Sequence, residues 1–219
     1  MTWLRSAFQD ELDAVTKSLL DLSSLVSEAI HRATHAILTA NLAEAEAVIA
    51  ADDKVDEIQH ELDSRIINII ARQQPVASDL RALITALRMS ADLERMGDMA
   101  HHVAKITRLR HPQAVVPSEL LLTIEEMGKV AQSIADKAGD VISSRDLEKA
   151  LELEKDDDEM DKLHRKIFTT LLDPSWAHGT ETAIDMTLIG RYYERYADHA
   201  VSVARRVYFL VTGKINVIS

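Results

Sequence analysis

The chain has 219 residues and a formal net charge of −11 at pH 7, which argues against nucleic acid as a partner because phosphate binding needs a basic face. It has no cysteine, which excludes disulfides, thiolate metal sites and cysteine nucleophiles. Glycine and proline are scarce, at 6 and 4 residues, and aromatic residues make up 4%, a composition that predicts an all-α protein.

Six long segments with a helical apolar period follow one another along the chain. Proline-bearing breaks at 73–75, 110–118 and 173–174, with softer polar breaks at 39–41 and 143–145, separate them. We predict helices at 3–39, 42–72, 77–110, 118–143, 146–172 and 180–212. Long helices joined by short loops fold back antiparallel to bury their apolar stripes, so we expect one three-helix bundle over 1–112 and a second over 113–219.

The second half of the chain repeats the first. Apolar residues of the first helix correspond to residues of the fourth at an offset of 105: Leu22, Val26, Ala29, Ala33 and Ile37 with Met127, Ala131, Ile134, Ala138 and Val141 or Ile142. A Glu-Arg-x-x-Asp motif begins at Glu94 in the third helix and again at Glu194 in the sixth. The chain is therefore expected to hold two tandem copies of one bundle.

Four carboxylate pairs share an i, i+4 spacing, which places both members of a pair on one helix face. The pairs are Asp52 with Asp56, Glu94 with Asp98, Asp157 with Asp161, and Glu194 with Asp198. Like charges at this spacing repel, and the repulsion grows when a neighbouring helix adds a second pair. A bound cation would remove the repulsion, so we predict one four-carboxylate metal site in each bundle.

The candidate ions are Mg²⁺, Mn²⁺, Ca²⁺, iron and Zn²⁺, since oxygen ligands dominate and a nitrogen from His101, three residues after Asp98, would broaden the choice. The spacing leaves an alternative open. Arg95 and Arg195 each precede a motif Asp by three residues, and Arg191 precedes Glu194 likewise. Ordinary ion pairs would then neutralise the carboxylates without a metal.

Other residues carry structural predictions. Gly97, inside a helix, predicts the close approach of a neighbouring element, because glycine there costs ~1 kcal/mol against alanine. The aromatic residues of the last helix, Tyr192, Tyr193, Tyr196, Tyr208 and Phe209, are assigned to the core and to the bundle interface. The histidines outside the motifs are assigned to the surface or to loops: His31, His35, His60, His111, His164 and His178.

The start of the chain lacks the apolar run of a signal peptide, and no segment reaches the ~18 apolar residues of a membrane span. A cytoplasmic location is therefore expected. No Gly-rich phosphate loop, nucleophile elbow or Ser/His/Asp order appears.

Three segments resemble the PhoU family of bacterial phosphate-uptake regulators. They are Gln73-Gln74-Pro75-Val76-Ala77-Ser78-Asp79-Leu80-Arg81, Leu93-Glu94-Arg95-Met96-Gly97-Asp98-Met99-Ala100 and Tyr193-Glu194-Arg195-Tyr196-Ala197-Asp198-His199-Ala200. The resemblance covers nearly the whole chain. It departs after the motifs, where the family usually has Asn-Ile-Ala and this chain has His102-Val103-Ala104 and Ser202-Val203-Ala204.

The resemblance implies a non-enzymatic, homodimeric regulator that acts between a phosphate ABC transporter, through its ATPase, and a membrane sensor histidine kinase. It would hold the phosphate-starvation response off when phosphate is plentiful. It also implies metal on the paired motifs: Asp52, Asp56, Glu94 and Asp98, then Asp157, Asp161, Glu194 and Asp198. Two other hypotheses stay open, a ferritin-like di-iron protein and a metal-free helical scaffold for another client.

Overall fold

The computed structural model describes residues 2–214. Over that range it consists of six helices and no strand, which confirms the all-α prediction: α1 (Thr2–Thr39), α2 (Leu42–Gln73), α3 (Ala77–Arg110), α4 (Leu121–Ser144), α5 (Leu147–Leu171) and α6 (Gly179–Thr212). The fourth helix begins three residues later than predicted. Pro117 opens a turn closed by a hydrogen bond from Leu120 N to Pro117 O at 3.0 Å, and the helix follows it. None of the described helices is both long and apolar enough to traverse a lipid bilayer.

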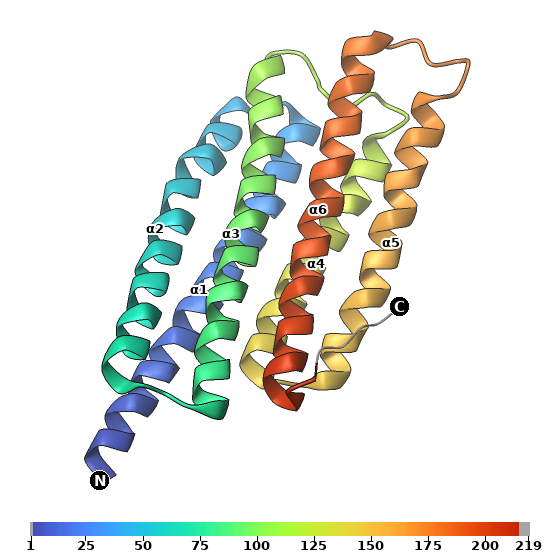
Figure 1. Cartoon of the computed structure of the whole chain (residues 1–219). Helices are drawn as coiled ribbons and strands as arrows, with labels where there is room; N and C mark the ends of the chain where they lie inside the picture. Colours follow the sequence, from blue (N-terminus) through green and yellow to red (C-terminus); the bar gives the residue numbers. More distant parts are fainter. Residues whose placement is uncertain (1, 215–219) are drawn as a thin grey trace.

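The helices form two layers. The order α2, α3, α6, α5 makes the front row, and α1 and α4 lie behind it (Figure 1). Helices α1 to α3 are the first repeat and α4 to α6 the second, so the two repeats lie side by side, with α3 against α6 and α1 against α4. The apolar core is continuous through both repeats. The boundary predicted near residue 112 therefore marks a repeat and not a gap in packing.

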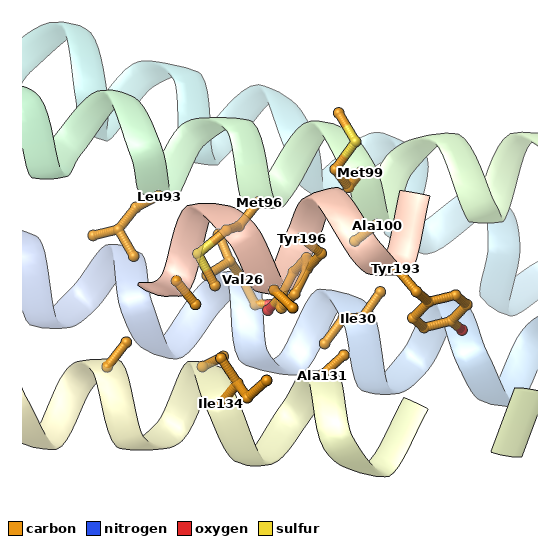
Figure 2. Packing of buried hydrophobic residues seen from close by; sticks show 14 of the residues in the cluster. Val26, Ile30, Leu93, Met96, Met99, Ala100, Ala131, Ile134, Tyr193 and Tyr196 are labelled. Carbon is orange, nitrogen blue, oxygen red and sulfur yellow. The ribbon is translucent and has the colours of Figure 1, made fainter. Parts of the chain in front are cut away.

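Two tyrosines of α6 fasten the second repeat to the first. Tyr193 and Tyr196 are fully buried between the layers, with the labelled residues of α1, α3 and α4 around them (Figure 2). Tyr196 Oη donates to the carbonyl of Val26 at 2.9 Å, and Tyr193 Oη lies 2.6 Å from Thr34 Oγ1. A buried phenol needs such a partner. The predicted place of these aromatic residues in the core is confirmed.

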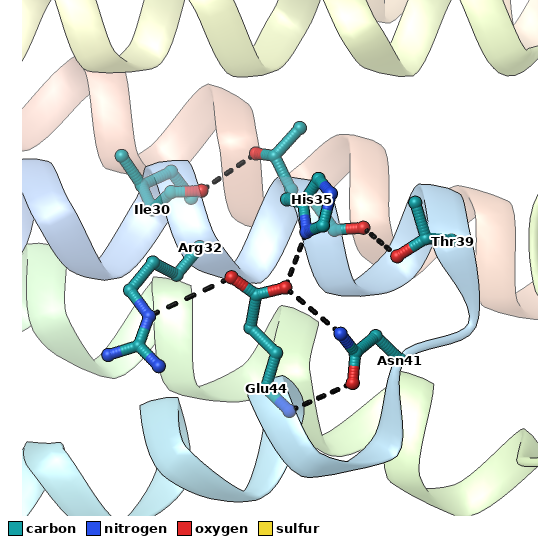
Figure 3. Close-up of polar contacts among 7 residues, drawn as sticks. Ile30, Arg32, His35, Thr39, Asn41 and Glu44 are labelled. Atoms are coloured by element: carbon teal, nitrogen blue, oxygen red, sulfur yellow. Dashed lines mark hydrogen bonds and ion pairs between the residues drawn. The ribbon is translucent and has the colours of Figure 1, made fainter.

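The turn between α1 and α2 is held by side chains. Asn41 is the N-cap of α2, and its side chain accepts from Glu44 N at 3.2 Å (Figure 3). The Glu44 carboxylate in turn contacts His35 and lies 3.8 Å from Arg32 Nε. The cap satisfies a backbone donor that the first turn leaves without a partner. The polar break predicted at 39–41 thus fixes how α2 returns along α1.

Helix α4 crosses α1 at Gly128. A Cβ added there would lie 2.3 Å from Thr34 Cγ2. We expect Gly128→Ala to destabilise the protein by about 1–3 kcal/mol despite its better helix propensity, because the core cannot absorb the methyl group. Urea unfolding measures this change. Thr34→Ser, which removes the contacted methyl group, should recover part of the loss, and an unchanged unfolding midpoint in Gly128→Ala would contradict the close packing.

Candidate metal sites on two helix seams

The first seam lies where α2 packs on α3. Helix α2 contributes Asp52 and Asp56, and α3 contributes Glu94 and Asp98, all half-buried at the margin of the core. Burial, followed by the negative charges of Asp52 and Asp98, raises the pKa of Asp56. Burial and the charge of Asp98 likewise raise the pKa of Glu94. The structure thus places on one seam the four carboxylates that the sequence assigned to one site, within reach of one another's charge.

Gly97 allows α2 to approach α3 at this seam. A Cβ at Gly97 would lie 3.2 Å from Val55 Cγ1 and 3.3 Å from Asp52 Oδ1. The close approach predicted from this mid-helix glycine is therefore confirmed. It holds the Asp52 carboxylate against α3, where His101 Nδ1 contacts it. The other ring nitrogen of His101, Nε2, is buried and has no hydrogen-bond partner among the described residues.

The second seam repeats this arrangement between α5 and α6. Asp157 and Asp161 lie on α5, and Glu194 and Asp198 on α6; all are half-buried except the exposed Asp198. Burial and the charges of Asp198 and Asp161 raise the pKa of Asp157 to about 6. Burial and the charge of Asp198 raise the pKa of Glu194. Both seams therefore concentrate negative charge where solvent only partly screens it.

Several of these carboxylates form ion pairs with arginines. Arg95 Nη1 lies 2.5 Å from Asp98 Oδ2, and Arg191 Nη1 lies 2.6 Å from Glu194 Oε1. Within residues 2–214 no three His, Asp or Glu side chains are gathered so that they could enclose an ion as they stand. The side chains of both arginines are more than half exposed, at 55% and 56%, so these pairs contribute little to stability. A cation could replace them at low cost if the carboxylates turn toward it.

His164 belongs to the second seam, and its assignment to the surface is wrong. It is half-buried beside Asp161 and Phe168, and a Cβ at Gly190 on α6 would lie 3.0 Å from its Cδ2. Its Nε2 is buried without a partner among the described residues, as in His101. Burial and the charge of Arg191 lower its pKa. The sequence does indicate this place, because His164 follows Asp161 by three residues just as His101 follows Asp98. The other five histidines assigned to the surface are exposed.

His102 and His199 turn away from the seams toward the contact between α3 and α6. The His102 ring stacks on Tyr192 at a centroid distance of 5.0 Å. His199 Nδ1 lies 3.2 Å from Asp92 Oδ1. Each seam therefore offers four carboxylates and one half-buried imidazole with an unpaired nitrogen. That donor set fits a divalent cation, because carboxylates supply charge and neutral imidazole suits the transition metals.

Asp157→Asn should stabilise the metal-free protein at pH 7. The pKa of Asp157 is higher in the folded protein, about 6 against 3.8, so the folded state holds the proton more tightly and stability falls as the pH rises between these values. The full shift would cost about 3 kcal/mol, which partial solvent exposure reduces to about 1–2 kcal/mol. Urea unfolding with a chelator at pH 7 and pH 4 should show the gain at pH 7 alone. The exposed neighbour Asp158→Asn is the control, and equal gains at both pH values would refute the assignment.

Together, the fold and the seams define a duplicated, two-layer helical protein with paired acidic sites and arginines at their edges. A PhoU domain model matches residues 19–107 and again 124–207. The chain belongs to the PhoU family.

Similar proteins match over their whole length. The phosphate-specific transport system accessory protein PhoU homolog 2 of Mycobacterium tuberculosis is 45% identical over 210 residues, covering 96% of this chain and 99% of that protein. PhoU homolog 1 of Mycobacterium leprae is 44% identical, covering 96% and 95%. The crystal structure of PhoU from Pseudomonas aeruginosa has a TM-score of 0.83 at 27% identity, covering 94% of this chain and 100% of that chain. The phosphate transport regulatory protein PhoU from Streptococcus pneumoniae has a TM-score of 0.85 at 25% identity, covering 95% and 99%.

Proposed function

We propose that this protein is an accessory regulator of phosphate transport that carries out no chemistry of its own. It acts in the cytoplasm as a homodimeric adaptor between the ATPase of a phosphate ABC transporter and a sensor histidine kinase, and it reaches the membrane only through these partners. When phosphate is plentiful it holds the phosphate-starvation response off. The observation that carries the proposal is the likeness to phosphate-specific transport accessory proteins, which runs from end to end of the chain.

The two seams hold the metal in this proposal. Asp52, Asp56, Glu94 and Asp98, with His101 beside them, form one ligand set, and the second is Asp157, Asp161, Glu194 and Asp198 with His164. The bound ion would supply positive charge that neutralises the carboxylates. The pKa values of Asp56, Glu94 and Asp157 are raised first by burial and then by neighbouring carboxylates, and they support the proposal because a bound cation offsets both the burial of negative charge and the repulsion. Neutral seams would then present a less acidic surface to the partners.

Deletion of the gene in its own bacterium, with a reporter for phosphate-starvation genes, tests the role. The reporter should stay on in high phosphate in the deletion strain, and the wild-type gene should switch it off. A copy with Asp56→Asn and Asp98→Asn should restore repression only in part. A reporter that responds normally to phosphate in the deletion strain would contradict the regulatory proposal.

The matched control for the seam variant is Asp53→Asn with Glu57→Gln. Asp53 and Glu57 have the i, i+4 spacing of Asp52 and Asp56 on α2 and are both exposed, so the control also removes two negative charges, but outside the seam. It should restore repression fully. Equal repression by the control and the seam variant would show that the regulatory role does not depend on the seam carboxylates.

A further inference from the structure

A groove opens between α3 and α6, near the start of α3 and the end of α6. Its volume is about 260 Å³. Three of the residues that line it are arginines, Arg88 from α3 and Arg205 and Arg206 from α6. Such a concentration of guanidinium groups stands out in a chain with a net charge of −11. None of the eight seam carboxylates lines it, although Arg205 lies near enough to Asp157 of the second seam for its charge to act on that carboxylate.

The arginines keep hydrogen-bonding capacity to offer. Arg206 Nε donates to Asp92 Oδ2 at 2.5 Å, and Arg205 Nε donates to Glu154 Oε1 at 3.2 Å. These bonds fix the two guanidiniums through Nε and leave the terminal Nη groups without a hydrogen bond to the described residues. Arg88 is exposed and has no ion pair with them. The carboxylate of Asp92 is also contacted by His199 Nδ1, so Arg206 is not its only partner.

Two hydroxyl groups join the arginines. Thr85 and Ser202 both line the groove, and Thr85 is 2% exposed. Elsewhere in these helices threonine hydroxyls donate to the carbonyl four residues earlier, as Thr107 and Thr187 do. The Thr85 hydroxyl makes no such bond to the described residues. The Thr85 hydroxyl is therefore free to donate to a ligand in the groove.

The repeat offers an internal comparison at the other end of the α3 and α6 contact. The positions that correspond to Thr85, Arg88 and Arg206 at the offset of 100 are Asp185, Leu188 and Ile106. Asp185 is bound there by Arg110, with Nε to Oδ2 at 2.6 Å. The basic groove is therefore not a general consequence of packing α3 on α6. It is a property of one end of the molecule.

We propose that this groove binds a phosphoryl group, either as inorganic phosphate or as part of a small organic phosphate. Guanidinium forks match the oxygens of a phosphate, and hydroxyl groups supply further donors to a tetrahedral anion. Ile84 and Phe209 complete the lining with apolar surface that could receive an organic moiety. These side chains alone support the site, which does not depend on the regulatory role proposed above.

Titration calorimetry on the full chain tests the site. The protein is first treated with a chelator so that phosphate cannot bind a metal on the seams, and it is titrated at low salt with inorganic phosphate and, separately, with ADP. We expect at least one of them to bind with a Kd of about 1 mM or tighter. Arg88→Gln should weaken this binding roughly tenfold or more, because it removes an exposed fork without touching the core. Thr85→Val, which keeps the shape, should weaken it too.

The control is Arg195→Gln, an exposed arginine on α6 outside the groove, which should bind as the wild type does. Binding of both probes with similar affinity would assign the site to free phosphate. Tighter binding of ADP that Phe209→Leu weakens would assign it to an organic phosphate. The proposal is overturned if neither probe binds, or if Arg88→Gln and the wild type bind alike.

Discussion

Affinity for Mn²⁺ at the first seam should fall roughly 100-fold, or ~2.7 kcal/mol, in a chain with Asp56→Asn and Asp98→Asn. The variant removes one carboxylate from each of the two helices, and the remaining pair, Asp52 and Glu94, carries half the charge. Titration calorimetry of the chelator-treated protein measures the change. The wild type should show two sites, and this variant should keep only the one on α5 and α6.

The control for this titration is again Asp53→Asn with Glu57→Gln, which should keep both sites because these exposed carboxylates lie outside the seam. Equal heats in the wild type and the seam variant would show that these carboxylates do not bind the metal. The ion pairs of Arg95 and Arg191 would then be the whole explanation of the motifs.

Truncation of a buried tyrosine should cause the largest loss of stability. Tyr196→Ala is expected to lower the free energy of unfolding by about 3–5 kcal/mol, because it opens a cavity between the layers and removes a hydrogen bond that joins α6 to α1. Tyr196→Phe keeps the ring and should cost only about 1 kcal/mol. Urea unfolding, monitored by circular dichroism, separates the contribution of the ring from that of the hydrogen bond.

Tyr208 provides the comparison on the same helix. It is half-buried, so Tyr208→Ala should cost less than half as much as Tyr196→Ala. Equal losses at the two positions would contradict the view that α6 is fastened to the first repeat through its buried tyrosines. A loss in Tyr196→Phe as large as in Tyr196→Ala would instead assign the effect to the hydrogen bond.

The helices and their duplication could be predicted because they depend on local periodicity. The apolar stripe that begins at Leu22 and its copy that begins at Met127 are buried as expected, except for Ala29, which is half-buried. The predicted start of α4 is three residues too early. Pro117 and Ser118 resemble a helix start, but the chain first makes a turn that ends at Leu120. The carboxylate seams followed from helix pitch together with the pairing of adjacent helices.

Contacts between the repeats could not be predicted in this way. Arg88 and Arg206 meet in one groove only because α3 packs on α6, and nothing in the spacing of either helix indicates that pairing. The same holds for His199, which follows the second motif but pairs with Asp92 of the other repeat. Side chains near a motif thus divide between the seam and the repeat interface according to tertiary packing.

Anomalous scattering from crystals soaked in Mn²⁺ would locate the ion among the side chains. We expect one peak between α2 and α3, within coordination distance of the first carboxylate set, and a second between α5 and α6. Peaks found only elsewhere, with Asp98 still paired to Arg95 and Glu194 to Arg191, would show that the seams bind no metal.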